Sequence, residues 1–240
     1  MGATLQDQQV IVVGGGSGIG FATAVAAAEA GARVVVVGRS AEGLARAASA
    51  VPGARTARAD VQDEEALAQL AAGLGTVDHV VVTAGSTRVG ALLDREPVPD
   101  QLGPLRVRLH GAAHVLRAFH PVMRADGSVT LTGGVSSDRP VRGAWVSSVG
   151  TAATEQFARA MALELAPLRV NAVAPGWTDT PMWDAVLGAD KDAVLAEAVK
   201  GQLTGRIVRP EEVAAAVVWL MSARSVTGEV VHVDGGARLT

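Results

Sequence analysis

The chain has 240 residues and a formal net charge of −3, and it contains neither cysteine nor tyrosine. These counts exclude a disulfide, a thiolate nucleophile, a Cys-ligated metal and a tyrosine proton donor. Lys191 and Lys200 are the only lysines, so none lies near the middle of the chain. The charge gives no basic footprint for nucleic acid. With no signal-peptide pattern and no long apolar run, we expect a soluble, cytoplasmic protein without a membrane partner.

Short β-branched runs alternate along the chain with alanine-rich segments of helical pattern. The strands expected are residues 10–13, 33–37, 56–59, 77–83, 129–132, 170–173 and 230–233. The helices expected are residues 18–30, 41–50, 64–72, 100–124, 147–165 and 210–221, and residues 177–206 look irregular. Apolar residues at successive strand positions are typical of parallel strands covered on both faces. The pattern predicts one domain over residues 1–240, an α/β fold with a Rossmann-type doubly wound parallel sheet of about seven strands and helices on both faces.

A glycine-rich turn joins the first expected strand to the first expected helix. Its glycines, Gly14, Gly18 and Gly20, permit a tight turn and let the backbone approach a ligand. The start of the following helix suits a pyrophosphate, because its N–H groups are unpaired and carry partial positive charge. A purely structural turn is the alternative. The place of the turn, directly after a strand and opening a helix, favours the ligand.

The spacing of these glycines resembles that of the short-chain dehydrogenase/reductase family, although Val13 stands where that family usually has Thr. Thr83-Ala84-Gly85 is similar to the end of the family's N-N-A-G motif, and residues 169–180 match its segment beside the nicotinamide. The resemblance covers essentially the whole chain and implies a nicotinamide cofactor and a homo-oligomer, a tetramer or else a dimer. It places cofactor binding at Gly14, Gly16, Ser17, Gly18, Ile19, Gly20, Arg39, Ser40, Asp60, Val61, Ala84, Gly85, Pro175, Gly176, Thr178 and Thr180.

The end of the second expected strand indicates which cofactor is preferred. NAD-specific folds place an acid there to bind the ribose 2′-hydroxyl, but here Gly38 is followed by Arg39 and Ser40. An arginine can pair with a 2′-phosphate, and no carboxylate stands there to repel it. A solvated arginine at a helix start is the alternative. We expect NADP(H) rather than NAD(H).

The acid–base residues that the resemblance leads one to expect are all replaced. In this family a Tyr donates a proton, a Lys four residues later lowers the pKa of that Tyr, a Ser orients the substrate and an Asn supports a water relay. Here those positions hold Ser147, Thr151, Gly134 and Arg108 respectively. Since the chain has no tyrosine, the loss does not depend on the alignment. The catalytic residues therefore stay unknown, and this is an atypical member of the family it resembles.

Several residues are candidates to replace this chemistry, each with a plainer alternative. Ser147 and Thr151 can hydrogen-bond a carbonyl or the nicotinamide ribose, or they simply fill a vacated pocket. Arg108 can stabilise an oxyanion or bind a carboxylate, or it is an ordinary salt-bridged side chain. His110 and His114 have a spacing that can bind metal, but no acidic motif accompanies them, and we expect no metal. Asp138 is the nearest carboxylate, and an ordinary charged turn is its alternative.

Residues 180–206 match the family's substrate lid in position. Met182 and Trp183 offer apolar and aromatic surface there, either to a small apolar or aromatic substrate or to the core. Three functions stay open. They are an NADP(H)-dependent oxidoreductase for a carbonyl or imine compound, an inactive homologue that keeps cofactor binding for sensing or assembly, and a non-redox cyclase or lyase that reuses the pocket.

Overall fold

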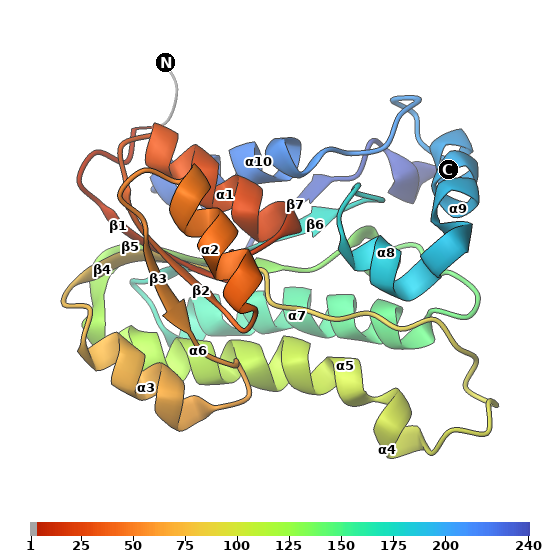
Figure 1. Ribbon diagram of the computed structural model, residues 1–240, viewed down its shortest axis with the longest axis horizontal. Helices are drawn as coiled ribbons and strands as arrows, with labels where there is room; N and C mark the ends of the chain where they lie inside the picture. The colour runs from red at the N-terminus through yellow and green to blue at the C-terminus, as the bar shows by residue number, and fades with distance from the viewer. Residues whose placement is uncertain (1–3) are drawn as a thin grey trace.

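Seven parallel strands form one sheet in the computed structural model, which describes residues 4–240. The order across the sheet is β3-β2-β1-β4-β5-β6-β7, and this confirms the predicted Rossmann-type doubly wound fold (Figure 1). The strands are β1 (Gln9–Val13), β2 (Arg33–Gly38), β3 (Arg55–Arg58), β4 (Val77–Val82), β5 (Met123–Thr132), β6 (Arg169–Pro175) and β7 (Val230–Val233).

Helices cover both faces of the sheet. The longer helices are α1 (Gly18–Glu29), α2 (Ala41–Ala50), α3 (Glu64–Ala72), α6 (Gly111–Phe119), α7 (Trp145–Glu164), α9 (Lys191–Lys200) and α10 (Pro210–Ser222). The shorter ones are α4 (Val98–Gln101), α5 (Gly103–Leu105) and α8 (Met182–Leu187). Helices α1, α2 and α10 lie on one face, and α3, α6 and α7 on the other. No helix of the described chain has the length and apolar character needed to cross a membrane.

The strand sequences explain this two-sided core. Successive side chains of a strand point to opposite faces of the sheet. In β1, Ile11 and Val13 therefore pack into the core under α3, α6 and α7, whereas Val10 and Val12 pack under α1, α2 and α10. All five residues of β1 are buried. A strand with valine or isoleucine at successive positions is stable only between two helical layers.

Three expectations about element boundaries are wrong. The single helix expected over 100–124 is divided into α4, α5, a π-helical turn (Arg106–His110) and α6, and β5 already begins at Met123. Pro104 and Pro121 lie in this segment, and proline interrupts the regular helical hydrogen-bond ladder. Residues 177–206 are not irregular throughout, because α8 and α9 form there.

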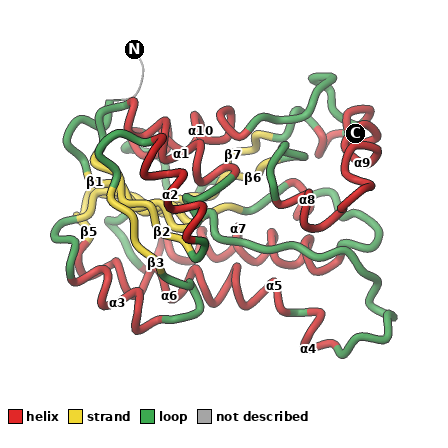
Figure 2. Tube along the Cα trace, in the orientation of Figure 1, coloured by secondary structure: helices red, strands yellow, loops and turns green. Residues whose placement is uncertain are grey.

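The order of the strands fixes where a ligand can bind. The chain crosses from β1 to β2 on one side and continues from β3 to β4 on the other, so β1 and β4 are neighbours at the switch point. In open α/β sheets the crevice beyond the carboxyl ends of such strands is the usual ligand site. The long loop after β4 runs from the carboxyl end of that strand towards α4 (Figure 2).

Candidate functional site

The glycine-rich turn between β1 and α1 lies at this carboxyl edge. Gly14 and Gly18 have φ angles of 92° and 52°, which glycine adopts without strain. A Cβ on Gly14 would lie 2.5 Å from the backbone N of Ala84, so the glycine lets the ends of β1 and β4 pack closely. The first helical hydrogen bond of α1 runs from Phe21 N to Ser17 O (3.1 Å). The N–H groups of Gly18, Ile19 and Gly20, in the first turn of α1, are therefore available to an anion.

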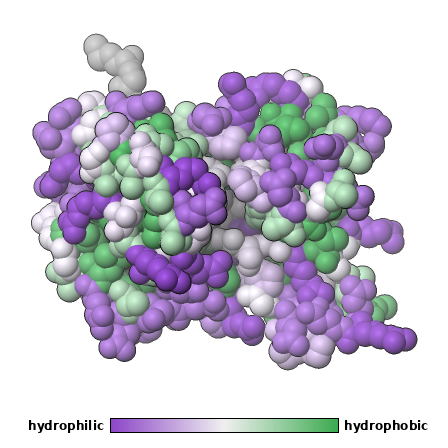
Figure 3. Space-filling view, viewed as in Figure 1, coloured by the Kyte–Doolittle hydropathy of each residue, from purple (hydrophilic) through white to green (hydrophobic). Residues whose placement is uncertain are grey.

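One cavity of about 900 Å³ extends from this turn along the carboxyl edge. The surface is visibly hollowed there (Figure 3). Every residue expected to bind the cofactor lines the cavity except Asp60, and Arg108, Gly134, Ser147 and Thr151 line it as well. The turn residues and the candidate reactive residues thus share one space.

Two arginines lie at the end of the cavity formed by β2 and α2. Arg39 Nη1 is 3.5 Å from Asp60 Oδ2, so Asp60 contacts Arg39 instead of lining the cavity. Arg46 donates a hydrogen bond from Nη2 to the carbonyl oxygen of Gly16 (2.8 Å). Arg46 was not among the sequence candidates. No sequence motif marks Arg46, because it reaches Gly16 only through the packing of α2, which starts after the Ser40 cap, on the glycine turn.

The opposite end of the cavity is rich in hydroxyl groups. Ser147, on α7, is hydrogen-bonded to Thr87 of the loop after β4. Thr151 is 3% exposed, and its Oγ1 donates to the carbonyl oxygen of Ser147 (3.0 Å) and lies 3.1 Å from Ser136 Oγ. A Cβ on Gly134 would lie 3.1 Å from Thr151 Cγ2. Ser136 and Thr87 had no sequence signal of their own.

A buried carboxylate holds the turn that follows β5. Glu155, on α7, is 5% exposed. Its Oε1 accepts hydrogen bonds from Gly134 N (3.1 Å) and from Ser137 Oγ (3.0 Å). This side chain does not line the cavity. It fixes the position of Gly134 and Ser137 relative to α7.

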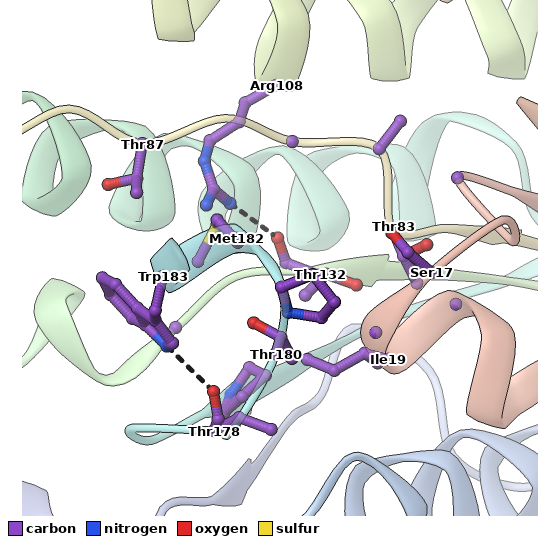
Figure 4. Close-up of a pocket in the computed structure, with 18 of the residues that line it drawn as sticks. Ser17, Ile19, Thr83, Thr87, Arg108, Thr132, Thr178, Thr180, Met182 and Trp183 are labelled. Atoms are coloured by element: carbon purple, nitrogen blue, oxygen red, sulfur yellow. Dashed lines mark hydrogen bonds between the residues drawn. The ribbon is translucent and has the colours of Figure 1, made fainter. Parts of the chain in front are cut away.

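Arg108 extends from the π-helical turn towards the strand ends. It donates from Nε to the carbonyl oxygen of Ser86 (3.1 Å) and from Nη1 to that of Thr132 (3.2 Å). Figure 4 shows the second bond. The stem packs on α7, since a Cβ on Gly150 would lie 3.1 Å from Arg108 Cδ. Burial lowers the pKa of the Arg108 guanidinium, which still stays charged in proteins.

Arginine is the only ionisable residue type along the whole cavity. Among the described residues that line it, Arg39, Arg46, Arg108 and Arg142 carry charge, and no carboxylate, histidine or lysine is present. Ordinary proton transfer uses groups whose pKa lies near the working pH. The side chains here offer hydrogen bonds and positive charge instead.

The lid contributes apolar surface. Met182 and Trp183 both line the cavity, which favours the substrate alternative over core packing. The rings of Trp177 and Trp183 lie 4.6 Å apart between centroids, and Trp183 Nε1 donates to the carbonyl oxygen of Thr178 (2.8 Å, Figure 4). This hydrogen bond ties α8 to the segment that follows β6.

The remaining candidates lie outside the cavity. His110 is exposed, and His114 bonds through Nδ1 to the carbonyl oxygen of Val61 (3.0 Å). Asp138 Oδ2 lies 2.8 Å from Nε2 of His232 on β7. Neither the histidine pair nor Asp138 is brought to the reactive end.

Comparisons with known proteins agree with this architecture. A family model described as enoyl-(acyl carrier protein) reductase matches residues 14–238. The chain is 33% identical to the short-chain dehydrogenase/reductase ATR9 of Stachybotrys chlorohalonatus, over 98% of this chain and 99% of that protein. The structure of the MalC reductase/Diels-Alderase from Malbranchea aurantiaca superposes with a TM-score of 0.90 at 30% identity, covering 98% of both chains. A small-chain dehydrogenase in complex with NADPH superposes with a TM-score of 0.84 at 27% identity, over 98% of this chain and 100% of that one.

Proposed function

Since the chain belongs to the short-chain dehydrogenase/reductase family, we propose that it is an NADP(H)-dependent oxidoreductase with a non-standard site. Its substrate is a small, apolar or aromatic carbonyl or imine compound. One observation carries the proposal: the glycine turn, the arginines beside α2, the hydroxyl groups of α7 and the lid all line a single cavity. A cofactor and a substrate therefore meet there without a barrier of side chains.

The residues of the cavity fit a phosphorylated dinucleotide. The part of the turn from Gly16 to Gly20, which includes the start of α1, holds the pyrophosphate, because it offers backbone N–H groups with little side-chain obstruction. Arg39, Ser40 and Arg46 bind the 2′-phosphate, since a dianion is matched by positive charge and hydroxyl donors. Thr178 and Thr180, which line the cavity beside the lid, hold the nicotinamide end. The similar structure solved with NADPH supports this choice.

The reaction then depends mainly on positioning. NADPH supplies a hydride when bound. Ser147 and Thr87 hold the carbonyl or imine group by hydrogen bonds, and Arg108 supplies positive charge near the strand ends. A hydroxyl group has too high a pKa to act as an unaided proton donor. The substrate is therefore one that needs none from the protein, such as an iminium ion, or one protonated by water.

A second candidate is a protein that binds the cofactor but performs a different reaction or none. The hydroxyl of Thr151 already bonds to the carbonyl oxygen of Ser147 and to Ser136, and no lining side chain titrates near neutral pH. This supports a cyclase or lyase that holds an apolar molecule in shape, or a sensor that keeps only cofactor binding. The similar MalC protein is named for both a reductase and a Diels-Alderase activity.

Binding and turnover assays test the proposal in order. Purified protein is titrated with NADPH and NADH, and the NADPH complex is then mixed with a panel of ketones, enones and cyclic imines while nicotinamide absorbance is followed. We expect NADPH to bind more tightly than NADH, and we expect at least one imine to oxidise the bound NADPH. NADPH binding without oxidation by any compound would favour the second candidate, and tighter NADH binding would overturn the cofactor assignment.

Assembly and location complete the proposal. We propose a homotetramer, or else a dimer, in the cytoplasm, as is usual for the family. Sedimentation at micromolar concentration tests this, and a monomer would contradict it.

A further inference from the structure

The charge along the cavity is one-sided. Four arginines and no carboxylate line it within the described chain. Under the proposed function, Arg39 and Arg46 are matched by the phosphate groups of the cofactor. Arg108 and Arg142 belong to the other end, which Thr87, Val141, Ser147 and the lid surround. Nothing in the cofactor accounts for positive charge there.

Arg108 is enclosed by neutral partners. Its two hydrogen bonds go to backbone carbonyl oxygens of Ser86 and Thr132, and no described carboxylate pairs with it. A partly buried charge without a counter-ion is unfavourable, and a ligand of opposite charge relieves that cost. An anion bound beside Arg108 would therefore be stabilised by this unpaired charge.

The unused donors of Arg108 have access to the cavity. A guanidinium has five N–H groups, and the two hydrogen bonds of Arg108 use one from Nε and one from Nη1. Nη2 has no acceptor among the described residues. A Cβ on Gly85 would lie 3.5 Å from Nη1 and 3.6 Å from Nη2, so the glycine leaves the face of the guanidinium uncovered. Two adjacent N–H groups in one plane match a carboxylate.

Arg142 adds a second cation at the rim. Its side chain is exposed, lines the cavity and forms no ion pair with any described residue. A cavity with charge of one sign attracts ligands of the other. The same cavity is also lined by the apolar side chains of Val89, Val141, Met182, Trp183, Leu187 and Val194. An apolar wall with two arginines fits a molecule with an apolar body and an anionic group.

We propose that this end of the cavity binds a carboxylate-bearing substrate, whose carboxylate pairs with Arg108 while Arg142 attracts it from solvent. The inference rests on the proposed function and narrows its substrate class to apolar or aromatic oxo or imino acids. A purely structural Arg108, which only joins the ends of β4 and β5, is the competing explanation. That role requires hydrogen-bond donors and no charge.

Benzoate and benzamide separate the two explanations, because they share a shape and differ in charge. Protein saturated with NADP⁺ is titrated with each, and quenching of tryptophan fluorescence reports binding, since Trp177 and Trp183 line the cavity. We expect benzoate to bind about tenfold or more tightly than benzamide, as for a charge-assisted pair. Added NaCl reduces the difference. Equal affinities would overturn the proposal.

Matched variants locate the charge. Arg108→Gln keeps donors for the carbonyl oxygens but removes the charge, so the preference for benzoate is lost while benzamide binding persists. Arg106→Gln, on the same turn but outside the cavity lining, keeps the preference. If Arg108→Gln does not fold, Arg142→Gln takes its place and weakens benzoate alone. An unchanged preference in a folded Arg108→Gln would contradict the proposal.

The outcome is separable from that of the proposed function. Benzoate preference without NADPH oxidation would support an anion-binding site in a protein that does not perform the redox reaction. NADPH oxidation with neutral compounds, without benzoate preference, would support the oxidoreductase and refute the substrate class.

Discussion

Arg39 and Asp60 form an ion pair at the end of the cavity beside β2, with 3.5 Å between Nη1 and Oδ2. The side chain of Arg39 is 68% exposed, and an exposed pair of this kind contributes little to stability. A 2′-phosphate with two negative charges can therefore compete with Asp60 for the guanidinium. The ion pair keeps Arg39 beside the cavity, and the guanidinium can still exchange Asp60 for a phosphate group.

Replacing Arg39 tests this directly. Arg39→Gln should weaken NADPH binding about tenfold or more and leave NADH binding nearly unchanged, since only NADPH carries the 2′-phosphate. Fluorescence titration with both cofactors gives the ratio. Arg55→Gln, at the start of β3, removes the same charge outside the cavity lining and is the control. Equal losses of affinity for NADH and NADPH would show that Arg39 does not bind the 2′-phosphate.

Arg46 should also affect the ratio of NADPH affinity to NADH affinity. Arg46→Gln removes positive charge and the bond to the carbonyl oxygen of Gly16, so NADPH affinity falls strongly and NADH affinity falls less. Its helical neighbour Glu42 is 89% exposed and 4.0 Å away. Glu42→Gln should preserve or slightly raise NADPH affinity, because it removes a competing carboxylate. A loss of affinity in Glu42→Gln would point to a disturbed helix α2 instead.

The sequence predicts those features of this protein that depend on local pattern. The valine runs predict buried parallel strands, because a strand with apolar residues at every position needs a helical layer on each face of the sheet. The glycines between Gly14 and Gly20 predict the turn, because its backbone conformation needs glycine. Arg46 could not be predicted, since its contact with Gly16 depends on how closely α2 packs on the turn. A Cβ on Gly16 would lie 3.3 Å from Gly43 Cα, and that proximity exists only in the fold.

The reactive end shows the same limit. The absence of tyrosine is certain from composition. The partners of Arg108, however, are carbonyl oxygens in the loop after β4 and at the last residue of β5, and no side-chain motif marks them. The lid helix α9 has good helix formers, yet the expectation for residues 177–206 is an irregular segment. Local propensity was the better guide there.

Glu155 should stabilise the turn after β5. Glu155→Ala removes the acceptor for Gly134 N and Ser137 Oγ and leaves a buried N–H unpaired, which costs about 1–3 kcal/mol. Glu155→Gln keeps one oxygen as an acceptor and should lose much less. Urea unfolding measures both free energies. If the two variants were equally stable, the hydrogen bonds to this turn would not matter for folding.

His79 should make stability depend on pH in the acid range. The residue is 4% exposed, with Nδ1 2.8 Å from Ser128 Oγ and Nε2 2.6 Å from Gln8 Oε1. Neutral histidine with its proton on Nε2 satisfies both contacts. The pKa of His79 is lowered from 6.5 to about 4, mainly by burial and to a smaller extent by Arg169, while Asp78 and Asp126 oppose the shift.

The unfolded chain therefore takes up this proton at a higher pH than the folded protein. The contribution of His79 is fully present above pH 6.5, declines as the pH falls towards about 4, and is then constant. At about 1.4 kcal/mol per pKa unit, the full loss is on the order of 3 kcal/mol. His79→Gln cannot take up this proton, so its free energy of unfolding should fall less steeply across that range.

Urea unfolding at a series of pH values measures the difference between the two proteins. The wild type should be the more stable at neutral pH, and its advantage over His79→Gln should shrink as the solution is acidified, because only the wild type loses the His79 contribution. His120→Gln, an exposed histidine replaced in the same way, should keep the slope of the wild type. Parallel curves for the wild type and His79→Gln would mean that the buried imidazole does not stay neutral in the fold.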